Sequence, residues 1–471
     1  MKSVIKFVLL LFITSTSFSC FEDTDDNPIS SIDIKDFVWK GLNFAYLYKD
    51  DVDDLANDRF GSDGDYQNYL NASENPESLF ENLIFKPDSV DRFSWITDDY
   101  IALEQQFSGI SKTSGAEFNF YYIPGSSSEV LGIVRLIHPN SNASQTVLER
   151  GQIFTSIDGQ SMTESNLGAL LSNDTYSIGL ATYEDNGTTI TTDDQIISTD
   201  ETVMLTKTVY NENPIFKNQL ITLQDKTIGY LMYNGFVSDY DSQLNDVFGA
   251  FKAQNVQYLI LDLRYNPGGS VNTATELGSM ITGIDNEVFA ILQYNSDLES
   301  NNSTYDFTNI LSKNEAAINS LGLTTLYVLT SDRSASASEM IINSLRSYIE
   351  VIQIGTKTVG KSQASVTIYD SPTFQKKDVN PSHSYAMQPL VAITVNKNNE
   401  AVPSAGLIPQ IEIAEDISNY GVLGEVSEPL LAAALTEILG SGRRSRNEPN
   451  LIKPISDSDS FIAHSEEMYI D

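Results

Sequence analysis

The second half of the chain alternates short apolar runs with stretches whose apolar residues recur at helical spacing. The runs 258–264, 326–330 and 351–355 predict buried strands, because each is short, apolar and bounded by turn residues. Apolar positions within 244–251 and 338–345 follow the spacing of one helix face. This order of strands and helices favours an α/β layered sheet with helices packed against it.

The first half of the chain has a different pattern. Apolar and aromatic residues first recur at helical spacings, and then give way to a succession of short, turn-linked strands. At the other end, the last part of the chain is polar and predicts poor order. The predicted divisions are a signal peptide (1–19), an acidic tether (20–30), a small helical N-terminal domain (31–100), a β-rich unit (101–208), the α/β core (209–440) and a polar tail (441–471).

Candidate chemistry centres on Ser336, which falls at the predicted strand-to-helix turn, and on Lys361, which follows it by 25 residues. A serine hydroxyl is a weak nucleophile unless a neighbouring base takes its proton. The usual base is histidine, but the chain has only His138, His383 and His464. A lysine can serve instead where burial disfavours its charged form. A helix that begins at the serine would also offer backbone N–H groups to a developing oxyanion.

Several segments resemble the C-terminal processing (tail-specific) serine protease family. One is the strand that ends in a turn-forming Pro-Gly-Gly sequence, where glycine lets the backbone approach a ligand closely. The resemblance covers roughly residues 100 to 440 and its motifs are specific in combination. The segments that carry it are Asp262 to Gly269, Ser334 to Glu339, Gly360-Lys361, Gly406 to Pro409 and Glu428 to Leu435.

The resemblance implies a role for each matching residue. Ser336 would be the nucleophile and Lys361 the general base. The backbone N–H of Ala337 and that of Gly268 or Gly269 would form the oxyanion hole. The family usually has a glutamine four residues after the lysine, where this chain has Ser365.

Gln363 stands two positions nearer to the lysine than the family's glutamine does. If the segment from 363 to 368 is extended, positions 363 and 365 face the same way, because strand side chains alternate. Gln363 is therefore the candidate for holding the lysine in place, and Ser365 is the alternative.

The β-rich unit resembles a PDZ domain, which precedes the catalytic core in this family. Phe107, Ser108, Gly109 and Ile110 look like the loop whose backbone N–H groups capture the terminal carboxylate of a peptide. The peptide itself would add as a strand to the sheet. The implied partners are protein or peptide substrates with free C-termini.

The N-terminus predicts export. Lys2 and Lys6 flank the start of a short apolar run, and Cys20 follows it as the only cysteine in the chain. This arrangement resembles a bacterial lipoprotein processing site, with a lipid on Cys20. We therefore expect a periplasmic or cell-surface protein, anchored by lipid to the membrane, with the outer membrane of a Gram-negative bacterium as the favoured location. The net charge of −36 argues against nucleic-acid binding.

Three alternatives remain open at this point. One, the binding of polysaccharide by a surface lipoprotein, has only the expected anchor and the aromatic content behind it. A Ser-His-Asp hydrolase would need His138 or His383 near the serine, and no Gly-x-Ser-x-Gly sequence surrounds Ser336. A catalytically inactive surface lipoprotein could use the same folds to bind peptide tails. Retention of both Ser336 and Lys361 favours the enzyme. No metal or other cofactor is implied, since three scattered histidines and one cysteine do not make a zinc site.

Overall fold

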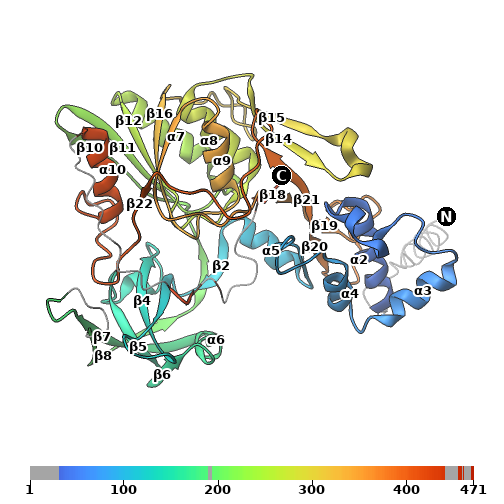
Figure 1. Cartoon of the computed structure of the whole chain (residues 1–471), viewed down its shortest axis with the longest axis horizontal. Helices are drawn as coiled ribbons and strands as arrows, with labels where there is room; N and C mark the ends of the chain where they lie inside the picture. Colours follow the sequence, from blue (N-terminus) through green and yellow to red (C-terminus); the bar gives the residue numbers. More distant parts are fainter. Residues whose placement is uncertain (1–30, 189–193, 441–453, 459, 461–467, 471) are drawn as a thin grey trace, which may run out of the picture.

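The computed structural model describes residues 31–188, 194–440, 454–458, 460 and 468–470. Figure 1 shows an α/β core, with a strand-rich unit below it and a group of helices from the N-terminal part of the chain at its side. The predicted mixture of a helical N-terminal region, a β-rich unit and an α/β core is confirmed. The predicted signal peptide, Cys20 and the acidic tether lie outside the described residues.

The core is built on a six-stranded sheet. Its strand order is β10-β11-β12-β16-β17-β22, and every neighbouring pair is parallel except β10 and β11. The strands are β10 (Ile215–Leu223), β11 (Lys226–Tyr233), β12 (Tyr258–Asp262), β16 (Thr325–Thr330), β17 (Glu350–Gly355) and β22 (Ile411–Glu412).

Helices cover both faces of this sheet, as the alternation of its side chains requires. Leu259 and Leu261 of β12 belong to the same buried cluster as Phe248 of α7, whereas Ile260 belongs to the cluster that contains Leu431 of α10. The covering helices are α7 (Asp241–Ala253), α8 (Val271–Thr282) and α9 (Ala337–Leu345) on one face and α10 (Pro429–Leu439) on the other.

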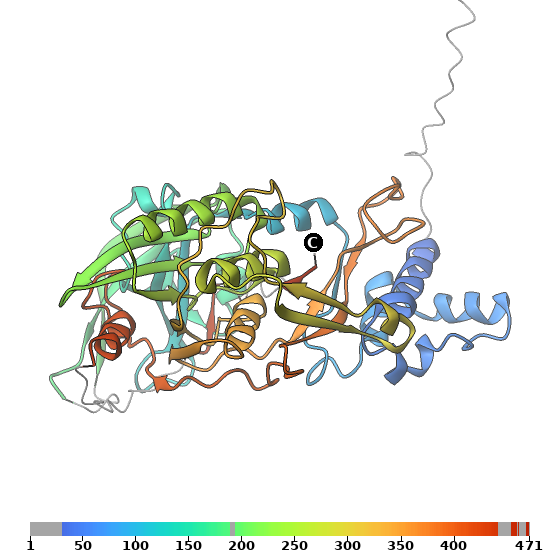
Figure 2. The same ribbon diagram turned by 90° about the horizontal axis from the view of Figure 1, so that it is seen from above.

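A second six-stranded sheet lies beside the core and contains the short strands β13 and β18. Its order is β13-β24-β18-β21-β14-β15. Figure 2 shows this part of the molecule between the core and the N-terminal helices. The strands are β13 (Gly269–Ser270), β24 (Met468–Tyr469), β18 (Gln363–Ser365), β21 (Leu390–Val395), β14 (Val288–Tyr294) and β15 (Ser303–Asp306).

The β-rich unit has its own hydrophobic cluster, with Phe118, Phe154 and Ile178 fully or almost fully buried. Its seven-stranded sheet has the order β23-β3-β4-β6-β5-β7-β8, and β2 (Ile110–Thr113) pairs separately with β9 (Thr208–Asn211). The sheet consists of β23 (Ser456–Asp457), β3 (Ala116–Tyr122), β4 (Glu129–Ile137), β6 (Gln160–Thr163), β5 (Ile153–Ile157), β7 (Thr175–Glu184) and β8 (Gln195–Thr206), with the short helix α6 (Leu167–Leu171).

The N-terminal helices do not have a core of their own. Buried residues such as Phe37, Leu42 and Phe80 belong to the same cluster as the apolar residues of the α/β core. Strand β1 also pairs with β20, which in turn pairs with β19. The elements are α2 (Ser31–Ala45), α3 (Asp63–Ala72), α4 (Pro76–Leu83), α5 (Tyr100–Phe107), β1 (Trp95–Thr97), β19 (Ile368–Tyr369) and β20 (Ala386–Gln388).

Two segments of the polar tail are ordered into strands, so the prediction of poor order is wrong for them. β23 adds to the edge of the β-rich sheet at β3, and β24 lies between β13 and β18. Composition could not reveal this, because both strands are two residues long and pair with distant parts of the chain.

Candidate active site

Ser336 lies where the sequence predicts it, in the turn between β16 and α9. It is the residue immediately before the helix, and its backbone has φ 61° and ψ −116°. A positive φ is strained for any residue with a Cβ, and such strain recurs at functional sites. The side chain is buried, and its Oγ has no hydrogen-bond partner among the described residues.

Lys361 lies in the loop between β17 and β18 and is fully buried. Its Nζ is 5.0 Å from the centre of the Phe93 ring, within the range of a cation–π contact. The same N-terminal loop contacts the backbone beside the lysine, where Arg92 Nη2 donates to the carbonyl oxygen of Gly360 at 3.2 Å. The N-terminal region therefore supplies part of the apolar cover over the lysine, which the sequence did not indicate.

Glu339 joins the loop before α9 (residues 331–336, the serine loop) to the loop between β17 and β18 (residues 356–362, the lysine loop). Its Oε2 accepts the backbone N–H of Ser336 at 3.0 Å and that of Lys361 at 2.9 Å. Its Oε1 accepts the N–H of Gly360 at 2.8 Å and the hydroxyl of Thr358. The two candidate catalytic residues are thus bonded through their backbones to one oxygen atom.

The carboxyl of Glu339 is fully buried. Burial raises its pKa, although the bonds from Thr358 and the three N–H groups act in the opposite direction. Sequence reasoning missed the role of this residue. The available signal was the Ser-x-x-Glu spacing of a helix capping box, in which the glutamate bonds back to the N–H of the serine.

The loop from β12 into β13 (residues 263–269, the glycine loop) packs directly against the serine loop. The carbonyl oxygen of Asn266 accepts the N–H of Ala335 at 3.2 Å and the hydroxyl of Ser338 at 3.0 Å. The Asn266 side chain in turn accepts the N–H of Gly268 at 2.9 Å. Gly269 has φ 131°, and a Cβ on it would overlap the carbonyl oxygen of Phe236, so no larger residue fits there.

The structure engages at least one of the three predicted oxyanion donors within the described residues. The N–H of Gly268 is already bonded to Asn266. Ala337 is the first residue of α9, where an N–H has no intrahelical acceptor. Gly269 lies in β13, beside the tail strand β24.

A buried ion network holds the start of the glycine loop. Arg264 is fully buried and donates to Asp262 at 2.9 Å, to Glu428 at 2.7 and 3.0 Å, and to Glu415 at 3.1 Å. Burial alone would raise the pKa of Glu415, but Arg150 and Arg264 outweigh it and lower the pKa to about 2. These charges fix the loop because each is paired and hydrogen-bonded.

The structure gives Gln363 a partner other than the one expected. Its Nε2 donates to the hydroxyl of Tyr48 at 3.0 Å. Strand β18 ends at Ser365 and is irregular before it, so it does not extend to residue 368 with strict alternation. The hydroxyl of Ser365 accepts instead from the fully buried amide of Gln388 at 3.1 Å.

The predicted carboxylate-binding loop joins α5 to β2. The N–H of Ser108 donates to the carbonyl oxygens of Glu104 and Gln105, and that of Gly109 donates to the carbonyl oxygen of Gln106. Two of the predicted donors are therefore used to end helix α5. Phe107 is the last residue of that helix and Ile110 is the first residue of β2.

The histidines are engaged in structural contacts. His383 Nε2 lies 2.9 Å from the carboxylate of Asp370, and its Nδ1 accepts the N–H of Tyr385 at 3.0 Å. His138 Nε2 lies 2.6 Å from a carboxylate oxygen of Glu117. Both ring nitrogens of His383 are thus occupied, which argues against its serving Ser336 as a base. His464 lies outside the described residues.

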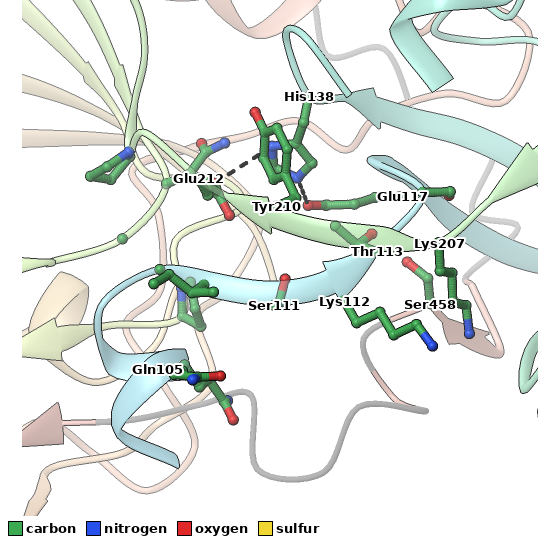
Figure 3. A pocket seen from close by; sticks show the side chains of 18 of the residues that line it. Gln105, Ser111, Lys112, Thr113, Glu117, His138, Lys207, Tyr210, Glu212 and Ser458 are labelled. Atoms are coloured by element: carbon green, nitrogen blue, oxygen red, sulfur yellow. Dashed lines mark hydrogen bonds and ion pairs between the residues drawn. The ribbon is translucent and has the colours of Figure 1, made fainter. Parts of the chain in front are cut away.

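A cavity of about 640 Å³ connects the β-rich unit with the glycine loop. Figure 3 shows its wall, where His138 faces Glu117. Among the described residues, no group of three or more His, Cys, Asp or Glu side chains could hold a metal ion. Within the same part of the chain, every helix is too short or too polar to span a membrane.

The fold and the segments that contain Ser336 and Lys361 match one protein family. The family model described as peptidase family S41 matches residues 227–408, and the peptidase S41 N-terminal domain matches residues 33–95. The chain belongs to peptidase family S41. The first match contains Ser336, Lys361 and the glycine loop, and the second contains Phe93.

Curated relatives share the same region. The chain is 26% identical over 179 residues to the "Probable CtpA-like serine protease" of Staphylococcus epidermidis. The matched region is 36% of this chain and 34% of that protein. It is 22% identical over 234 residues to the "Carboxyl-terminal-processing protease" of a Picosynechococcus species. This matched region is 50% of each chain. The chain thus spans between a third and a half of the length of these relatives.

A solved structure matches more of the chain. The crystal structure from Bacteroides fragilis named as an S41 protease has a TM-score of 0.68 and 24% sequence identity, and covers 86% of this chain and 97% of that chain. At this identity, the match shows a common fold.

Proposed function

We propose that this chain is a serine endopeptidase in which Ser336 is the nucleophile and Lys361 is the general base. The observation that carries the proposal is the Glu339 carboxylate, which accepts the backbone N–H groups of both residues on a single oxygen. A dyad needs its two loops held in register, and the shared acceptor joins them. Membership of peptidase family S41 supports the same reading.

The proposed reaction is an acyl transfer in two halves. Ser336 Oγ attacks the carbonyl carbon of the scissile peptide bond while its proton passes to the side-chain nitrogen of Lys361. The tetrahedral intermediate then expels the amine product, which takes the proton from Lys361. Water attacks the acyl-enzyme in the second half, again giving its proton to Lys361, and the return of that proton to Ser336 Oγ releases the acid product.

The oxyanion of the intermediate would be stabilised by two backbone donors. The N–H of Ala337 at the start of α9 is one. We favour Gly269 over Gly268 as the second, because the N–H of Gly268 is taken up by Asn266.

We further propose that the β-rich unit is a PDZ-like domain that selects substrates by their free C-termini. The cavity that runs from this unit to the glycine loop supports a path between recognition and cleavage. Export and lipid anchoring at Cys20 are likewise proposals, and the anchor would place the enzyme on a membrane surface in the periplasm or outside the cell.

The test is hydrolysis of an unfolded model protein with an apolar C-terminal tail by the chain lacking residues 1–20, with products identified by mass spectrometry. Cleavage is expected for the wild type and for neither Ser336→Ala nor Lys361→Ala, while all three proteins bind the tail. Cleavage by Ser336→Ala at the wild-type rate would refute the nucleophile. Tail binding by every variant with no cleavage by any, across a range of substrates, would favour the catalytically inactive surface lipoprotein instead.

A further inference from the structure

The last described strand of the chain lies inside the catalytic sheet. β24 is bonded on one side to β13, with Met468 opposite Gly269 and Tyr469 opposite Ser270. On the other side it pairs with β18, with Tyr469 opposite Ser365, and the N–H of Ile470 donates to the carbonyl oxygen of Ser365 at 3.1 Å. The tail therefore lies between the glycine strand and the strand that follows the catalytic lysine.

The side chain of Tyr469 makes two specific contacts. Its ring stacks on that of Phe107, with centroids 4.4 Å apart and planes 20° from parallel. Its hydroxyl lies 3.5 Å from the carbonyl oxygen of Phe236, the residue that pairs with Gly269. Aromatic stacking of this kind contributes beyond the burial of area. The position of Tyr469 is thus an aromatic subsite directly beside the glycine strand.

An earlier part of the tail occupies the edge of the β-rich sheet. β23 pairs antiparallel with β3, and bonds at its two ends join Ile455 to Phe120 and Ser458 to Phe118 at 2.8 and 3.0 Å. This is strand addition to an open sheet edge, the mode in which peptide-binding domains capture extended ligands.

The same part of the tail is also tied to the catalytic loop. Asp457 forms an ion pair with Arg333, which lies three residues before Ser336. With the tail in place, Ser336 and Lys361 are both fully buried, so a substrate cannot reach them without displacing something. β24 is the short strand that pairs with both β13 and β18.

We propose that residues 454–458 and 468–470 act as an internal peptide ligand, and that the slot between β13 and β18 is a binding site for an extended peptide strand with an aromatic residue at the position of Tyr469. The tail fills this slot and competes with peptides of the same kind. That these peptides are substrates rests on the proposed function, whereas the occupation of the slot does not.

The proposal is tested first by binding, without catalysis. The probe is a fluorescent peptide with the sequence of residues 464–471, and the proteins are Ser336→Ala with the complete tail and Ser336→Ala lacking residues 468–471. A tethered ligand competes at an effective concentration of roughly millimolar. The truncated protein should therefore bind the probe at least about tenfold more tightly. Equal affinity for the two proteins, or no binding to the truncated protein, would overturn the proposal.

Two point variants guard against misfolding of the truncated chain, because they keep the backbone pairing of β24. Tyr469→Ala should weaken the tail and allow the probe to bind more tightly, while Tyr469→Phe keeps the ring and should resemble the full chain. If Tyr469→Ala instead lowers the melting temperature and still excludes the probe, β24 is a permanent structural strand and the proposal fails.

Hydrolysis of a short peptide separates this proposal from the proposed function. With Ser336 intact, removal of residues 468–471 should raise kcat/KM by about tenfold or more, and the free peptide should restore inhibition by raising KM alone. Probe binding with no hydrolysis by any form would refute the proposed function and leave the slot assignment standing. Hydrolysis that neither truncation nor the free peptide changes would refute the slot assignment alone.

Discussion

Replacing Glu339 by alanine should separate the two catalytic loops. The change removes the acceptor of three buried backbone N–H groups, those of Ser336, Gly360 and Lys361, and of the Thr358 hydroxyl. An unsatisfied buried donor costs about 1–3 kcal/mol, and a water in the vacated space would satisfy part of the set, so we expect a loss of about 3–5 kcal/mol in the free energy of unfolding. A domain of ordinary stability survives this loss and can be assayed.

The effect on activity should exceed what the lost stability explains. Displacement of either loop by about 1 Å can cost on the order of 100-fold, so kcat should fall by about that factor while KM changes little. Urea unfolding measures the stability and peptide hydrolysis under folded conditions measures the rate. Glu276→Ala is the matched control, because this buried glutamate of helix α8 also accepts a backbone N–H, that of Ser312 at 2.6 Å. It should lower stability without changing kcat.

Glu339→Gln gives a sharper version of the test. Glutamine keeps one oxygen but replaces the other by a donor, so it can satisfy only part of the set. Since burial raises the pKa of Glu339, the folded protein binds the carboxyl proton more tightly than the unfolded chain does, and the protonated carboxyl contributes stability. That contribution is complete below the unfolded pKa and is lost as the pH rises through the folded pKa, and glutamine should abolish this pH dependence. If Glu339→Gln kept both kcat and stability at the wild-type values, the bridging role would be refuted.

Three further changes test separate parts of the site. Ser336→Gly should be about 1–2 kcal/mol more stable than Ser336→Ala in urea unfolding, since glycine relieves the positive φ; equal stability would mean that the turn relaxes without strain. Phe93→Ala should lower kcat about tenfold with little change in KM, since Lys361 loses its cover, whereas Phe93→Leu should not; equal rates for both would exclude this role. The lowered pKa of Glu415 contributes about 3 kcal/mol of stability, which is present above the unfolded pKa of about 4 and is lost as the pH falls towards about 2. The free energy of unfolding, measured across this pH range, should therefore depend on pH less in Glu415→Gln than in the wild type.

The sequence was sufficient for the parts of the fold that depend on local pattern. The strands β12, β16 and β17 and the helix α9 lie where apolar runs and helical spacing predicted them, because each buries one local set of side chains. Ser336 was placed at the start of its helix for the same reason. These features need only a few consecutive residues and a sheet to pack against.

Features that depend on distant partners were missed. Phe93 covers Lys361 from another part of the chain, and Gln388 donates to Ser365 from a strand of a different sheet. Neither residue lies in a motif, and a single sequence carries no record of such contacts. Gln363 was assigned by its distance from the lysine, yet the structure gives it Tyr48 as a partner.

The tail shows most clearly why composition can mislead. A polar segment with few apolar residues cannot form a core of its own, and on that ground poor order was the expected state. A strand can, however, be stabilised by backbone bonds to edges that other segments have already built, and this requires almost nothing of its own sequence. β23 and β24 use such edges at β3 and between β13 and β18. A strand edge that binds the tail through backbone bonds would also bind other extended peptides that fit. For this reason we propose the same positions as a peptide-binding site.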